Sequence, residues 1–185
     1  MPVSEDLAVK AAPGLLVLIS KGLARILPSP IRISLVAGTP CELTHPANAV
    51  GLCLRTWRIK VTNKGQTHLE CIAKLESMKR VDGVPYTNSY LPIGLRTQHQ
   101  SGQNRPGGMF SLRPYETKLV EVASLDESKS GAEIQLHYES TSYVNVVPQE
   151  KYELEIAIYG AHKPRRAKFT LSVDGTGRLR MRSVA

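Results

Sequence analysis

Residues 56–76, TWRIKVTNKGQTHLECIAKLE, contain two runs in which apolar and polar side chains alternate. In the first run, apolar side chains occupy every second position from Trp57 to Val61. In the second run, they do so from Leu69 to Leu75. A period of two places each apolar set on one face of a pleated strand. The sequence therefore predicts two β-strands, each with one face against a core.

The four residues that link the two runs, 63–66, are Asn-Lys-Gly-Gln. Asn63 and Gly65 tolerate the positive φ angles that short hairpin loops require. We therefore expect the two strands to fold back on each other as an antiparallel hairpin, with Val61 opposite Leu69.

The composition is that of an ordinary globular protein. With 185 residues, of which 42% are hydrophobic and 22% charged, the chain is long enough to close one core without disulfides or a metal. Only 5% of the residues are aromatic, which disfavours surfaces that stack sugars or single strands on exposed rings. The net charge of +8 fits either a surface that keeps the protein soluble or an anionic partner.

The same alternation recurs from Pro30 onward, separated by turn residues and without any helical pattern. Residues 37–50 and 97–108 are rich in Gly, Pro, Gln and Asn, and we expect both to be loops. This pattern predicts an all-β protein, an antiparallel β-sandwich of seven to eight strands formed by residues 30–185. The further expected strands are Ile31–Leu35, Leu91–Leu95, Thr117–Ser124, Ile134–Tyr138, Tyr152–Ile158 and Ala167–Val173, and Arg178–Arg182 is a candidate short edge strand in addition.

Residues 1–29 form a separate N-terminal segment with a short amphipathic helix. Apolar residues recur at spacings of three and four over Leu15–Leu27, until Pro28 ends the pattern. Lys21 and Arg25 interrupt this stretch too early for a membrane span. Two alternatives remain: the helix docks on the domain, or it lies in a membrane interface as a peripheral contact.

The three cysteines, Cys41, Cys53 and Cys71, have neither the spacing of metal ligands nor that of a redox pair. We expect free thiols that face the core, which fits a reducing compartment. A cytoplasmic location follows from this, with attachment to the periphery of a membrane as the variant.

The segment WRIKVTNKG at residues 57–65, followed by the alternating run to Leu75, resembles a hairpin of immunoglobulin-like β-sandwich modules. It is most similar to the bacterial cell-adhesion-related type, whose hairpins read V-x-N-x-G before an alternating strand. Residues 152–156 and 169–173 resemble later strands of these modules. The chain lacks the cysteine pair of antibody domains, and residues 79–108 form a long insertion. The resemblance implies an immunoglobulin-like sandwich with a binding or spacer role and no shared catalytic residues.

No arrangement of residues predicts an enzyme. The five histidines do not lie at metal-ligand spacing from one another or from a cysteine, so no metal and no cofactor are expected. His137, Glu139 and Ser140 have the residue types of a catalytic triad, but one short segment cannot arrange them as base, orienter and nucleophile. The acidic pair Asp126-Glu127 is explained by a solvated strand face or loop.

One group of residues does suggest a binding site: a stretch near the C-terminus that is rich in basic residues. Arg166 and Lys168 are out of phase with the apolar residues of their strand, as Arg178, Arg180 and Arg182 are with theirs, so they face away from the core. If the two strands pair, they form one basic ribbon able to contact phosphates. The alternative is an edge strand protected from aggregation by its charges. The candidate anion-binding residues are Arg165, Arg166, Lys168, Arg178, Arg180 and Arg182.

These observations lead to a non-enzymatic interaction or structural module, with a protein as the expected partner. The alternative function is binding to nucleic acid or to an anionic membrane surface through the basic C-terminal ribbon.

Overall fold

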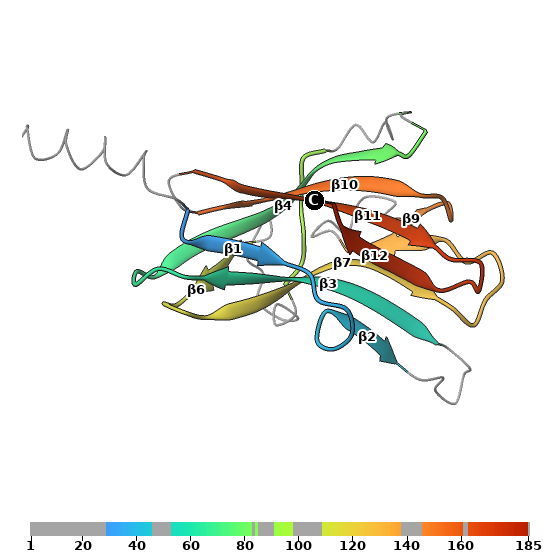
Figure 1. The fold of residues 1–185 in the computed structure, drawn as a ribbon, viewed down its shortest axis with the longest axis horizontal. Helices are drawn as coiled ribbons and strands as arrows, with labels where there is room; N and C mark the ends of the chain where they lie inside the picture. The colour runs from blue at the N-terminus through green and yellow to red at the C-terminus, as the bar shows by residue number, and fades with distance from the viewer. Residues whose placement is uncertain are drawn as a thin grey trace, which may run out of the picture.

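A computed structural model describes residues 29–45, 53–82, 84, 91–97, 109–137, 146–160 and 163–184. The described residues form two antiparallel β-sheets that pack around a shared core, so the all-β sandwich prediction is confirmed (Figure 1). The expected helix over Leu15–Leu27 lies outside the described residues.

The first sheet has six strands in the order β1-β3-β7-β8-β9, with β2 also paired to β3. Strands β1 and β2 pair with opposite ends of β3 along the same edge, because β1 is opposite residues 60–63 and β2 opposite residues 54–57. The strands of this sheet are β1 (Ile31–Ser34), β2 (Glu42–His45), β3 (Leu54–Asn63), β7 (Thr117–Asp126), β8 (Ile134–Leu136) and β9 (Val146–Val147).

The second sheet also has six strands, in the order β12-β11-β10-β4-β5, with β6 paired to β4. The C-terminal strand β12 is the edge of this sheet, as the sequence predicted. The strands are β4 (Leu69–Arg80), β5 (Ile93–Gly94), β6 (Met109–Leu112), β10 (Tyr152–Tyr159), β11 (Arg165–Val173) and β12 (Leu179–Ser183).

The predicted hairpin is wrong, because β3 and β4 belong to different sheets. β3 pairs with β7, with Thr62 opposite Thr117, whereas β4 pairs with β10, β5 and β6. Asn63 turns the chain from one sheet into the other: its side chain donates to Thr67 O and accepts from Gly65 N. Two strands joined by a short loop show the same alternation of apolar and polar residues whether they pair as a hairpin or enter different sheets. The sequence pattern therefore did not distinguish the two arrangements.

The core lies between the two sheets. Nine residues that the alternation places inward are each at most 3% exposed, which confirms the predicted face of β3, β4, β10 and β11. These residues are Trp57, Ile59, Val61, Cys71, Leu75, Leu154, Ile156, Phe169 and Leu171.

Other expectations are corrected in detail. Twelve strands are present among the described residues rather than seven to eight, because short strands share the edges of the long ones. One of these, β2, lies within residues 37–50, which were expected to be a loop. Its residues pair with β3 because the long β3 extends beyond β1.

The cysteines are free, as predicted. Cys41 and Cys71 are buried and Cys53 is half-buried. Burial raises the pKa of the Cys71 thiol to about 11, so it stays protonated at neutral pH.

Residues 93–97 pass from the second sheet to the first. Leu95 N donates to Ala73 O in β4, and Glu121 N in β7 donates to Arg96 O. Thr97 then forms an isolated bridge with Val120. This segment links the sheets at the side away from β1 and β12.

Candidate functional site

The predicted basic ribbon exists as a pair of strands. β11 and β12 are antiparallel, with Thr170 opposite Arg182 and Ser172 opposite Arg180. Lys168 precedes Thr170 on the same outward face. The expected pairing of the two segments is therefore confirmed.

Acidic neighbours neutralise much of this ribbon. Arg166 Nε lies 3.6 Å from Glu155 Oε1, and Arg180 Nε lies 2.8 Å from Asp174 Oδ2. The hydroxyl of Thr176, together with Arg180, holds the pKa of Asp174 well below its usual range. On the outward face of the ribbon, Lys168, Arg178 and Arg182 are exposed cations without a carboxylate of the described residues within ion-pair distance.

The six candidate residues do not form one site. Arg165 and Arg166 begin β11, opposite the end of β10, whereas Arg178 lies in the turn at the other end of the ribbon. Strand β11 separates these ends by nine residues, close to 30 Å of extended chain. Arg165 and Arg166 instead share one end of the sandwich with cations from other parts of the sequence.

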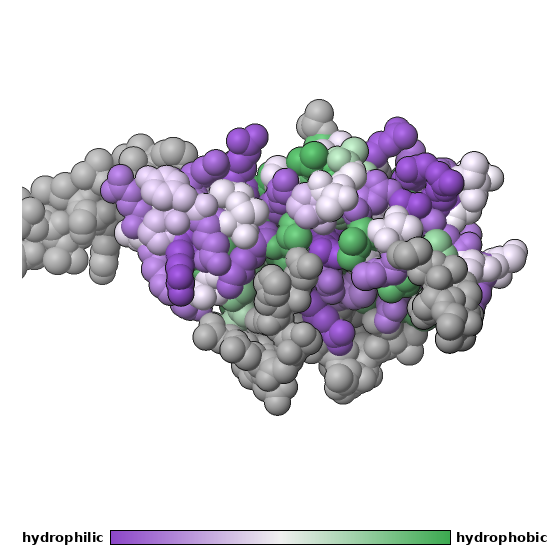
Figure 2. Space-filling view, turned by 90° about the horizontal axis from the view of Figure 1, so that it is seen from below, coloured by the Kyte–Doolittle hydropathy of each residue, from purple (hydrophilic) through white to green (hydrophobic). Residues whose placement is uncertain are grey.

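We call that group the basic end. It lies where the loops β3–β4, β6–β7 and β10–β11 turn, at the left of Figure 1. On the face shown in Figure 2, the described residues toward this left end are mostly hydrophilic, whereas hydrophobic residues lie nearer the middle. The basic end consists of Lys64, Arg113, Lys163, Arg165 and Arg166, all exposed.

Backbone contacts bring these loops together. The loop before β7 lies beside the end of β3, because Asn63 N donates to Glu116 O and Asn63 Nδ2 donates to Arg113 O at 3.1 Å. The loop after β10 lies against the start of β4: a Cβ on Gly160 would be 2.3 Å from Glu70 O. The two sheets fix the positions of these loops. Lys64 and Arg165, which lie in two of them, are about 100 residues apart in the sequence.

Tyr115 is at the tip of the β6–β7 loop. Its φ of 61° is unusual for a bulky residue, and its side chain is 65% exposed. The turn is held by the hydrogen bond from Arg113 N to Glu116 Oε2, at 2.7 Å, and by the one from Glu116 N to Arg113 O, at 3.1 Å. A fixed turn therefore presents an aromatic ring to solvent next to the basic end.

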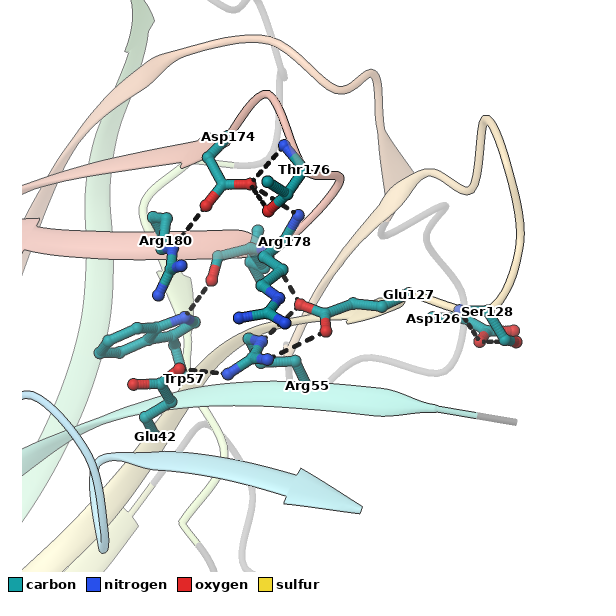
Figure 3. Close-up of polar contacts among 11 residues, drawn as sticks. Glu42, Arg55, Trp57, Asp126, Glu127, Ser128, Asp174, Thr176, Arg178 and Arg180 are labelled. Carbon is teal, nitrogen blue, oxygen red and sulfur yellow. Dashed lines mark hydrogen bonds and ion pairs between the residues drawn. The ribbon is translucent and has the colours of Figure 1, made fainter. Parts of the chain in front are cut away.

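A second polar group joins the two sheets near β12 (Figure 3). The Arg55 guanidinium pairs with Glu42 and with Glu127, and its Nη2 donates to Glu127 Oε2 at 3.0 Å. Glu127 Oε1 also accepts from Leu179 N at 3.1 Å, and the Trp57 indole donates to Leu179 O at 2.8 Å. The first sheet thus holds both backbone groups of the residue that begins β12.

This network is structural. The Arg55 and Glu127 side chains are only 11% and 10% exposed. The hydrogen bonds that Arg55 donates to Glu127 raise the pKa of Arg55. The prediction of a solvated strand face or loop at Glu127 is therefore wrong. Sequence reasoning missed the network because its members are separated by up to 137 positions, between Glu42 and Leu179.

A third polar group lies on the outward face of the first sheet. His137 Nε2 is 3.0 Å from Ser124 Oγ, and His137 Nδ1 is 3.8 Å from Glu121 Oε2. Glu121 also lies near Arg58, whose Nε is 3.9 Å away. Burial lowers the pKa of His137, Glu121 opposes this change, and Arg96 and Arg58 add to it.

These residue types resemble a nucleophile, a base and an orienting acid, but the geometry does not serve catalysis. Ser124 is fully buried, which keeps a substrate from its hydroxyl. The separation of 3.8 Å between His137 and Glu121 exceeds hydrogen-bond distance. Glu139 and Ser140, rejected on sequence grounds as triad partners of His137, lie outside the described residues.

Within the described residues, no group of three or more His, Cys, Asp or Glu is placed to hold a metal ion. In the same part of the chain, no helix is long and apolar enough to cross a membrane. Comparison of the chain with known protein families, curated proteins and solved structures finds no match.

Proposed function

We propose that this chain is a non-enzymatic interaction module with an immunoglobulin-like fold. The carrying observation is the strand order. One sheet contains β1-β3-β7 and the other β11-β10-β4. Taken in chain order, these six strands occupy the places of A, B, E and of G, F, C in immunoglobulin-like sandwiches.

A tyrosine supports this assignment. Tyr152 is the first residue of β10, the counterpart of strand F, and its hydroxyl donates to Pro148 O at 3.2 Å. A tyrosine that bonds to the backbone a few residues upstream is characteristic of this corner in such sandwiches. The chain departs from the pattern in β8 and β9, which follow β7, and in the added strand β12.

The interaction role rests on what this scaffold offers. A rigid sandwich presents exposed loops at both ends, and binding residues concentrate on such loops. The Arg55 and His137 groups bond within the fold, and two buried atoms of the described residues, Arg58 Nε and Asp126 Oδ2, have no hydrogen-bond partner but are not accessible to a partner protein. Exposed loop residues are therefore the groups that can contact a protein partner, in the cytoplasm or at the periphery of a membrane.

The test is reconstitution with a purified partner. Proteins crosslinked to the tagged full chain in cells of its source are identified and produced separately, and binding is measured by calorimetry. We expect saturable binding. Substitution of exposed loop residues should abolish this binding, while circular dichroism shows that the fold of the variant is intact. Failure of every crosslinked candidate to bind when purified would contradict the proposal.

The second candidate function is polyanion binding through the ribbon, supported by Lys168 and Arg182 on one exposed face. Its test is the variant Lys168→Ser/Arg182→Ser. If the face binds nucleic acid, log affinity against log salt becomes shallower by about two units. The role of edge protection is supported instead if physiological salt abolishes nucleic-acid binding by the wild type and if the variant aggregates.

A further inference from the structure

We infer that the basic end docks on an anionic membrane surface. This inference rests on the proposed role as an interaction module and names the partner of one end. The fold gathers five exposed cations there from three loops. The carboxylates of that end, Glu70, Glu116 and Glu155, are fewer, and Glu155 pairs with Arg166. Anionic lipid headgroups attract such clusters by about 1 kcal/mol per Lys or Arg near the surface, close to fivefold in affinity.

The cations are available for this contact. Lys64, Arg113, Lys163 and Arg165 are exposed, and none of them makes an ion pair with another described residue. By contrast, Arg80 at the opposite end pairs with both Asp82 and Glu150. Four exposed cations without an ion pair to a described residue therefore lie together at the basic end, and the opposite end has Lys79, Lys151 and Arg178 besides the paired Arg80.

Tyr115 favours a membrane over other polyanions. Tyrosine is enriched at membrane interfaces, where the ring contacts the acyl boundary and the hydroxyl stays hydrated. Backbone conformations such as that of Tyr115 cluster at ligand contacts, and here the exposed ring lies on a fixed turn. One such ring does not provide the successive stacking platforms that single-stranded nucleic acid uses.

The attachment of the N-terminal segment agrees with this placement. The described chain begins at Ser29-Pro30, and Pro30 O accepts from Lys64 N at 2.7 Å, so residues 1–28 join the domain at the basic end. Their sequence contains the amphipathic stretch Leu15–Leu27. Stable attachment to a membrane takes two signals, such as an apolar element and a polybasic patch.

The test is sedimentation of the full chain with vesicles. One set contains equal amounts of phosphatidylcholine and phosphatidylserine, and the other phosphatidylcholine alone. We expect binding to the first set only, and Lys64→Ser/Arg113→Ser to weaken it on the order of thirtyfold. The control Lys79→Ser/Lys151→Ser removes two exposed, unpaired cations from the opposite end and should bind as the wild type does.

Tyr115 provides a second measurement. Tyr115→Ser should weaken vesicle binding without changing its dependence on salt, whereas Tyr115→Trp should retain it. Urea unfolding establishes that each variant is folded.

Three results would overturn the inference: no sedimentation of the wild type, equal loss in the control, or tighter binding to a single-stranded RNA at physiological salt that Lys64→Ser/Arg113→Ser abolishes. A purified protein partner that still binds in the absence of vesicle binding would leave the proposed function intact and remove this inference alone.

Discussion

At the scale of single residues, Trp57 combines two roles. Its ring is 3% exposed within the core, and its indole N–H bonds to Leu179 O in the other sheet. Burial of a large ring and a hydrogen bond between sheets act on different parts of the side chain. Two substitutions therefore separate them.

We expect Trp57→Ala to lower the free energy of unfolding by about 3–5 kcal/mol, because it leaves a cavity between the sheets. Trp57→Phe keeps most of the buried ring and should lose about 1–3 kcal/mol, mainly because Leu179 O is left without its donor. Urea unfolding measures both. Equal losses for the two variants would contradict a separate contribution from the hydrogen bond.

His137 predicts a dependence of stability on pH. Burial lowers its pKa in the folded state below the value of 6.5 that it has when unfolded. The unfolded chain therefore binds a proton first, so the stability present above pH 6.5 decreases as pH falls through the folded-state pKa. In urea unfolding, His137→Gln should show a weaker dependence between about pH 7 and 5. An unchanged dependence would assign the effect to other groups.

At the scale of elements, β12 is attached at its first residue and free along its outer edge. The first sheet captures Leu179 through Glu127 and Trp57, whereas β12 pairs on one side only, with β11. The cations of β12, Arg180 and Arg182, alternate with the buried Leu179 and Met181. Charges on a short edge strand hinder pairing with another chain, which is the structural role that the sequence left open.

The Arg55 network should contribute far more than a surface ion pair. Glu127→Ala leaves a nearly buried guanidinium without its main partner, which costs about 3–5 kcal/mol. The control is Glu150→Ala, which breaks the exposed pair with Arg80 and should cost less than about 1 kcal/mol. Urea unfolding compares the two variants. Similar losses would show that the network does not hold β12.

At the scale of the whole molecule, the fold depends on β3 and β4 entering different sheets. Thr62 and Thr117 are opposite one another in β3 and β7, with their hydroxyl oxygens 2.8 Å apart. In the hairpin expected from the sequence, Lys60 would instead face Glu70. The two arrangements therefore place different pairs within reach of a disulfide.

We expect Thr62→Cys/Thr117→Cys to form a disulfide under mild oxidation, because opposite residues of paired strands have Cα atoms close enough to be bridged. Lys60→Cys/Glu70→Cys should not crosslink within one molecule. Mass spectrometry of non-reduced digests distinguishes the two results. A crosslink in the second variant alone would restore the hairpin and contradict the strand order.

The sequence by itself determined the local part of this fold. The alternation around Trp57, Leu154 and Phe169 identified the strands and the face of each that is buried, because a period of two reflects one strand against one core. The same pattern placed Arg166 and Lys168 on the outward face. The positions and core residues of the long strands β3, β4, β10 and β11 therefore followed from local periodicity alone, whereas the short β2 and β9 did not.

Only the tertiary structure decided which strands are neighbours. The partner of β3, the capture of β12 by Glu127, and the meeting of Lys64, Arg113 and Arg165 at one end all depend on contacts between distant segments. Alternation has the same form whether a strand pairs within a hairpin or crosses to the other sheet, so it carries no information about the partner. The ion pairs that neutralise the ribbon, and the position of the unpaired charge, follow from that choice.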